Sequence, residues 1–149
     1  MTATGHAIIG TVIAAKIGNP ALAIPIALGS HFVADAFPHW DTGYHRGQKS
    51  KERFFIQSAI DVLIGFVASY ALIQIFFPQT NLAYAFLMII VAQLPDWLTA
   101  PYLFFGLNFP PFSTVYKIQK YCDNRLDMPW GVINQIIIVA AVVILGKLF

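Results

Sequence analysis

Three apolar segments, each about as long as a bilayer is thick, constrain this chain more than any other feature of its sequence. They run from Phe54 to Phe77, from Leu82 to Phe105 and from Trp130 to Phe149. A helix needs about 20 apolar residues to cross the hydrocarbon core of a membrane. Charged residues make up only 11% of the chain, less than half of the roughly 25% typical of soluble globular proteins. The sequence therefore predicts an all-α integral membrane protein, with residues 1–149 forming a single membrane domain.

The N-terminal apolar region is interrupted by a turn signal. The run "KIGNP", Lys16 to Pro20, combines a charge, a glycine, an asparagine and a proline, and such a combination favours a turn. It predicts one helix over about 3–17 and a second over about 20–37, with Pro20 near the first turn of the second helix. The first helix would rise only about 22 Å at 1.5 Å per residue, which is short of a full span. We therefore expect a helical hairpin that is tilted or that begins below the membrane surface.

The rest of the chain completes a polytopic helical bundle of about four to five transmembrane or membrane-embedded helices. The predicted elements are a polar loop at 38–53, a helix over about 54–77, a short turn at 78–81, a helix over about 82–105 and a last helix over about 129–149. Pro95 and Pro101 favour a kink or an early end in the helix over 82–105. The mixed segment at 106–128 contains an aromatic and basic stretch that suits an interfacial helix.

Basic residues gather on one side of this predicted topology. The loop at 38–53 and the segment at 106–128 hold seven of the nine Lys and Arg residues, and the other two are Lys16 and Lys147. The positive-inside rule places the basic loops in the cytoplasm, together with the N-terminus. The basic cluster has two interpretations: it sets the topology alone, or it also recruits an anionic lipid or a phosphorylated amphiphilic substrate. The bilayer is the expected partner, and no nucleic acid is expected.

Ionisable side chains interrupt the apolar helices at one common depth. His31 and Asp35 are four residues apart, so they share one face of their helix. His6 and His31 are equally distant from the turn that joins their helices, and Asp61 and Asp96 are nearly equally distant from the turn at 78–81. Five ionisable groups on four helices should therefore lie in one layer.

Three carboxylates in one apolar layer need a compensating charge. Each costs roughly 2.5–3.5 kcal/mol on insertion scales, and the helices over 20–37, 54–77 and 82–105 contain no Lys or Arg. Two imidazoles and three carboxylates suit a divalent metal, with Zn²⁺ or Mn²⁺ favoured. The predicted metal ligands are His6, His31, Asp35, Asp61 and Asp96.

Simpler interpretations of these residues stay open. His6 would be an interfacial side chain, His31 and Asp35 would hydrogen-bond each other, and Asp61 or Asp96 would be protonated and bonded to a Gln or Tyr. Polar groups of this kind often hold helices together in membranes.

Two stretches carry a resemblance to a known family. "MTATGHAIIG" at the N-terminus and "ALGSHFVADAFPHWD" at 27–41 resemble the bacterial inner-membrane proteins called predicted membrane-bound metal-dependent hydrolases. The family's Gly-His and Ser-His-x-x-x-Asp elements correspond to His6, His31 and Asp35. "YHRG" at 44–47 and "LPDW" at 94–97 are similar to its His-Arg-Gly and Pro-Asp elements, in a changed order. The resemblance implies a metal site and a prokaryotic inner membrane.

The leading functional hypothesis is a metal-dependent hydrolase that acts near the cytoplasmic membrane face on a lipid-like or other amphiphilic phosphoester. Asp61, Asp96 and His39 are the expected catalytic residues, with one carboxylate as general base. Arg46, with His39 or His45, would stabilise the anionic group of the substrate at the rim. Two alternatives remain: an ion- or proton-handling protein, in which the polar layer is a transport site, and a structural or partner-binding membrane protein.

Overall fold

Each apolar segment of the sequence forms a helix, and the mixed segment at 106–128 forms one more. The structure, a computed structural model, describes residues 1–149. Its α-helices are α1 (Ala3–Lys16), α2 (Pro20–Ala36), α3 (Lys51–Phe76), α4 (Leu82–Phe105), α5 (Phe112–Cys122) and α6 (Trp130–Leu148). A short 3-10 helix covers Arg46–Gln48, and no β-strand is present. The predicted all-α membrane bundle with an N-terminal helical hairpin is confirmed, and α5 occupies the segment expected to hold an interfacial helix.

Side-chain caps explain where several helices begin. The side chains of Thr2, Asn19 and Asn81 accept hydrogen bonds from the first turns of α1, α2 and α4, which satisfies amide groups that have no partner within the helix. Ser50 does the same for α3 by accepting from the Arg53 amide. This cap makes α3 begin three residues before the apolar run that predicted it, so its first turn is charged rather than apolar.

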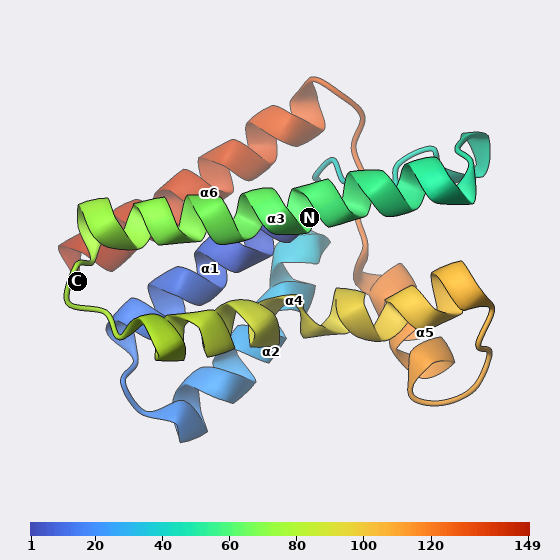
Figure 1. Ribbon diagram of the computed structural model, residues 1–149. Helices are drawn as coiled ribbons and strands as arrows, with labels where there is room; N and C mark the ends of the chain where they lie inside the picture. Colours follow the sequence, from blue (N-terminus) through green and yellow to red (C-terminus); the bar gives the residue numbers. More distant parts are fainter.

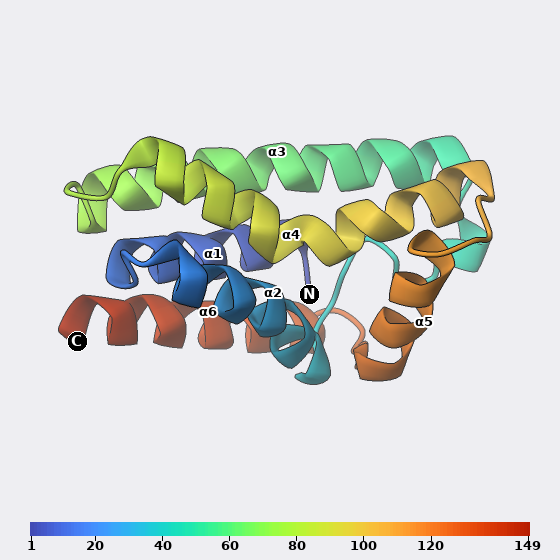
Figure 2. The ribbon, with the colours of Figure 1, turned by 90° about the horizontal axis from the view of Figure 1, so that it is seen from below.

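The shortest of the apolar helices, α1, lies at the centre of the bundle. Nine of its 14 residues are buried, and it packs against α2, α3, α4 and α6. It lies between α3 and α6 in Figure 2. The long helices α3 and α4 lie roughly antiparallel in Figure 1. By contrast, the backbones of α3 and α4, which are neighbours in the chain, come close at few points, and phenylalanine rings such as Phe66 and Phe86 make contact between them.

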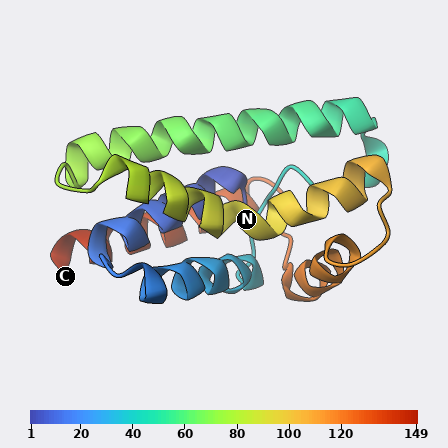
Figure 3. The same ribbon diagram turned by 60° about the horizontal axis from the view of Figure 1, so that its bottom comes forward.

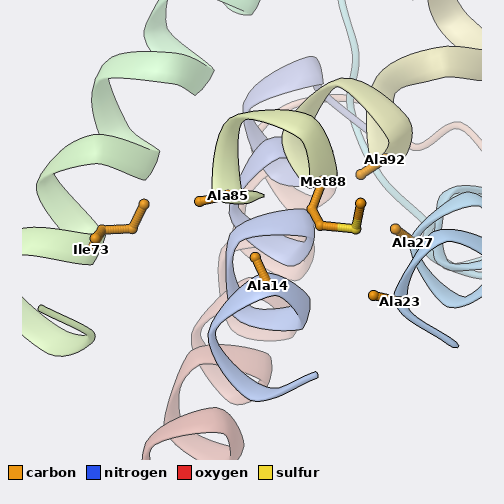
Figure 4. Packing of buried hydrophobic residues seen from close by; sticks show 7 residues of the cluster. All are labelled: Ala14, Ala23, Ala27, Ile73, Ala85, Met88 and Ala92. Atoms are coloured by element: carbon orange, nitrogen blue, oxygen red, sulfur yellow. The ribbon is translucent and has the colours of Figure 1, made fainter. Parts of the chain in front are cut away.

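Small residues allow this close packing around α1. A Cβ at Gly10 would lie 2.7 Å from the Met88 carbonyl oxygen of α4, and one at Gly65 of α3 would lie 3.1 Å from the Ala7 Cβ. Small residues at helix contacts are typical of membrane bundles, because they let backbones approach. The main apolar cluster follows the same pattern, and Figure 4 shows Met88 pointing from α4 toward α2 among alanines.

Three helices, α3, α4 and α6, are long and apolar enough to cross a membrane. Their outward faces carry large apolar side chains in the open, among them Leu63 and Val67 of α3 and Ile136 of α6. An exposed apolar surface of this extent is what a lipid environment requires, since monomeric soluble proteins rarely expose large contiguous apolar patches.

Unequal helix lengths open a space at one end of the bundle. At 1.5 Å per residue, α3 and α4 extend for roughly 36–39 Å, whereas α1 and α2 extend for roughly 21–26 Å. The long helices therefore continue past the start of α1 and the end of α2. There α5 packs along the second half of α4, as Figure 3 shows. Asp35, Asp96 and Gln119, described next, line this space.

Candidate metal centre

The N-terminal hairpin brings two buried histidines face to face. The rings of His6 and His31 stack with centroids 3.8 Å apart and an angle of 17° between their planes, which confirms that the two residues are level. His31 Nδ1 lies 2.8 Å from the Ala92 carbonyl oxygen. A carbonyl can only accept, so Nδ1 carries a proton, and Nε2 presents a lone pair when the ring is neutral. A backbone partner on one ring nitrogen is the usual way to orient a metal-binding histidine.

Asp96 of α4 and Gln119 of α5 complete a converging group with His31. The Gln119 amide nitrogen lies 2.9 Å from His31 Nε2 and 2.7 Å from Asp96 Oδ1. An amide nitrogen donates, so His31 Nε2 and Asp96 Oδ1 both direct lone pairs at the Gln119 nitrogen. Two ligands of a single metal ion converge in the same way. Ligand atoms of His6, His31 and Asp96 all lie within 4.8 Å of one another. The two histidines of this group are buried and Asp96 is half-buried, and together they could hold a metal ion.

Asp35 lies between the two histidines. Its Oδ1 is 3.1 Å from His6 Nε2, and its Oδ2 is 3.3 Å from His31 Nε2. Oδ1 also pairs with the Met1 ammonium group. Asp35 reaches this position because it stands one turn after His31 on the same face of α2. Four of the five predicted ligands are thus brought together, from three helices.

The fifth predicted ligand, Asp61, is used differently. Its carboxylate accepts hydrogen bonds from the Ala3 amide at 2.8 Å, from the Thr4 amide at 3.2 Å and from the Thr4 hydroxyl at 2.7 Å. These contacts satisfy the first turn of α1 and place a negative charge at the positive end of the helix dipole. Asp61 therefore lies against the start of α1 and is not part of the converging group.

One cavity of about 660 Å³ runs along this site. It is lined by five carboxylates and two basic side chains, and five aromatic rings are among its other lining residues. Its carboxylates belong to Asp35, Asp41, Asp61, Asp96 and Asp123, its basic groups to Lys120 and Arg125, and its aromatic rings to Phe54, Phe55, Trp97, Phe104 and Tyr116. The cavity therefore combines charged groups with apolar side chains, which suits an amphiphilic ligand.

The expected rim residues lie outside this cavity. Arg46 donates to the Leu103 carbonyl oxygen at 3.2 Å and covers the Phe54 ring. The exposed ring of His45 packs on Tyr44, with centroids 4.3 Å apart. Sequence reasoning did not identify Arg125 and Lys120 as the basic groups that line the cavity, because nothing in the pattern of the segment at 106–128 distinguishes them from its other basic residues.

His39, the third expected catalytic residue, is fully buried at the edge of the cavity. Its Nε2 lies 3.3 Å from Asp123 Oδ1, and a ligand atom of Asp41 is within 4.8 Å of both residues' ligand atoms. Burial raises the pKa of the Asp41 carboxyl, while the nearby Arg125 guanidinium acts in the opposite direction.

Comparisons of this chain with protein family models, with curated proteins and with solved structures give no match.

Proposed function

We propose that this protein is a metal-dependent hydrolase of the prokaryotic inner membrane that acts on an amphiphilic phosphoester. One observation carries the proposal: the converging donors of His6, His31 and Asp96 lie beside a cavity that combines carboxylates and basic groups with an aromatic wall. Binding pockets typically have this composition, an apolar lining with a few convergent polar groups.

His6, His31 and Asp96 would hold the metal, and Asp35 would complete the set because its oxygens face both imidazole nitrogens at 3.1 and 3.3 Å. A divalent metal in such a site lowers the pKa of bound water to about 7 and polarises a phosphoryl oxygen. The Ala92 carbonyl fixes the His31 ring, so this ligand is oriented before an ion arrives. Such preorganisation avoids an ordering cost on binding.

Substrate binding would use both the basic groups and the aromatic rings of the cavity. Arg125 and Lys120 would bind the anionic headgroup, while Phe54 and Phe104 would pack against an apolar chain. The surrounding outer faces of α3 and α4 are apolar, so a lipid-like substrate would reach the cavity from the bilayer. The positive-inside rule supports a cytoplasmic location for this end, because the loops there carry most of the basic residues.

The test is the metal content of the full chain purified in detergent, together with release of phosphate from a short-chain phosphatidic acid. We expect bound Zn²⁺ or Mn²⁺, a melting temperature lowered by a chelator, and phosphate release that the chelator abolishes. His31→Gln and Asp96→Asn should lose the ion held by these residues, and Gln74→Ala, on an exposed part of α3, should keep it.

Absence of any bound metal, with a melting temperature that ignores both chelator and added Zn²⁺ or Mn²⁺, would overturn the proposal. Metal binding without hydrolysis of phosphatidic acid or of other amphiphilic phosphoesters would remove the enzymatic part and leave a metal-binding membrane protein.

A further inference from the structure

We propose that the chain carries a second divalent-cation site, formed by His39, Asp41 and Asp123. One ligand atom from each residue lies within 4.8 Å of the other two. None of the three belongs to the group of His6, His31 and Asp96, and the segment that supplies Asp123 follows α5, far from His39 in the chain.

The imidazole of His39 is buried, oriented and without a partner on its inner nitrogen. The side chain is 0% exposed, and Nδ1 lies 2.9 Å from the Phe37 carbonyl oxygen. Because that carbonyl can only accept, Nδ1 carries a proton, and Nε2 presents a lone pair when the ring is neutral. Nε2 has no hydrogen-bond partner, although Asp123 Oδ1 lies only 3.3 Å away. Two buried acceptors that face each other at this distance are favourable only when a cation or a proton lies between them.

Each carboxylate likewise has one free inner oxygen. Arg125 Nε lies 3.3 Å from Asp41 Oδ2 and 2.7 Å from Asp123 Oδ2. The other oxygen of each group, Oδ1, is buried and has no hydrogen-bond partner. Arg125 therefore holds one oxygen of each carboxylate and leaves the other free to bind an ion, as the second-layer partners of metal ligands do.

The backbone holds the three residues in place. The His39 amide donates to the Asn124 carbonyl oxygen at 3.0 Å, and the Leu126 amide donates to the His39 carbonyl oxygen at 2.7 Å. The Asn124 amide also donates to the Asp35 carbonyl oxygen at 2.9 Å. These bonds tie the chain after α2 to the chain after α5, so the ligands are fixed by main-chain pairing and not by the ion alone.

Charge supports a divalent cation here. Two carboxylates and one guanidinium leave this group with one net negative charge when His39 is neutral. A third carboxylate oxygen, Asp35 Oδ1, is 3.9 Å from His39 Nε2. Imidazole nitrogen and carboxylate oxygen are ligands that Zn²⁺ and Mn²⁺ accept. A proton on His39 would be the competing solution, and it is one of the outcomes tested below.

The second site adjoins the first through Asp35, which faces His6 on one side and His39 on the other. Paired ions in enzymes that cleave phosphoesters are about 3.5–4 Å apart and stabilise both the attacking and the leaving oxygen. A catalytic role for a second ion rests on the proposed function, but the existence of the site does not.

The experiment counts ions per chain in the full-length protein, purified in detergent and equilibrated with Mn²⁺. Wild type should bind two. Asp123→Asn and His39→Gln should each bind one, and so should His31→Gln, which leaves the second site intact. Asp127→Asn is the matched control, because this carboxylate is four residues from Asp123 and accepts only from the neighbouring Met128 amide; it should bind two.

A second measurement uses wild type alone, so that misfolding of a variant cannot decide the result. The electron paramagnetic resonance spectrum of the protein with Mn²⁺ should show the coupling expected of two neighbouring ions. Suppose that wild type binds one ion, which Asp123→Asn keeps and His31→Gln loses. That result would overturn the second site and leave the proposed function standing, with a proton on His39 in place of the ion. One ion lost by Asp123→Asn but kept by His31→Gln would support the second site and overturn the first. No ion at all would overturn both.

Discussion

Replacing Asp61 with alanine should destabilise the protein without removing its metal. The Asp61 carboxylate is the acceptor for the Ala3 and Thr4 amides at the start of α1, at 2.8 and 3.2 Å, and for the Thr4 hydroxyl at 2.7 Å. Alanine offers no acceptor in its place. The two amides would then be left without a partner at the buried end of the central helix.

The magnitude follows from the number of donors released. Loss of a helix cap costs about 0.5–2 kcal/mol, and an unsatisfied buried donor costs about 1–3 kcal/mol. The Thr4 hydroxyl keeps a second acceptor, the Asp61 main-chain oxygen at 3.0 Å, so it adds little. Two amides at about 1–2 kcal/mol each give a destabilisation of about 2–4 kcal/mol. Asp61→Asn retains one acceptor oxygen but no charge, so it should lower the free energy of unfolding by about half as much.

The assay is reversible unfolding in mixed detergent micelles, with the metal content measured on the same samples. Gln74→Ala, which alters an exposed polar side chain on the same helix, should change the free energy of unfolding by less than about 0.5 kcal/mol. If Asp61→Ala lost its metal while its stability stayed at the wild-type value, Asp61 would be a ligand and the capping assignment would be refuted.

Three other substitutions test separate features. Gly10→Ala should destabilise the protein by about 1–3 kcal/mol, because its Cβ would lie 2.7 Å from the Met88 carbonyl oxygen, whereas Gly29→Ala meets no atom within 4 Å and should be neutral in the same unfolding assay. Gln119→Ala removes the amide that bridges His31 and Asp96, so calorimetric titration should show metal affinity equal to or higher than that of wild type; weaker binding would make Gln119 a supporting residue. A cysteine at position 48, in a Cys122→Ser background, should resist labelling from outside intact cells, and efficient labelling would reverse the proposed topology.

The positions of residues along the membrane normal could be predicted from the sequence, because counting from a turn fixes depth. The level pair of His6 and His31 was found in this way, and their stacked rings confirm it. Their contact also follows from the hairpin, since adjacent antiparallel helices have little choice of neighbour. Depth and adjacency together therefore located the histidine part of the site.

Lateral position could not be predicted by the same counting. Asp61 and Asp96 were expected at similar depth in one site, but α1 packs against both α3 and α4, whose backbones come close at few points. The lengths and hydrophobic patterns of the helices do not specify which helix lies between two others. Close approach at Gly10 and Gly65 decides this arrangement, and it depends on pairs of residues far apart in the chain.

The loop residues were the hardest to place. Asp123 and Arg125 reach His39 because the main chain at 124–126 pairs with it, and a single isolated bridge leaves no periodic signal in a sequence. Their part of the chain was correctly expected to hold an interfacial helix, but the residues after that helix could not be assigned a partner.

The central position of α1 has a consequence for how the protein is made. A 14-residue helix is too short to cross a bilayer unaided, and its packing partners α3, α4 and α6 all follow it in the chain. Because synthesis proceeds from the N-terminus, α1 emerges from the ribosome before any of them exists. His6 would face lipid at considerable cost until Asp35 and the later helices surround it. Insertion of α1 into its final place must therefore be a late event, completed only after helices made much later have entered the membrane.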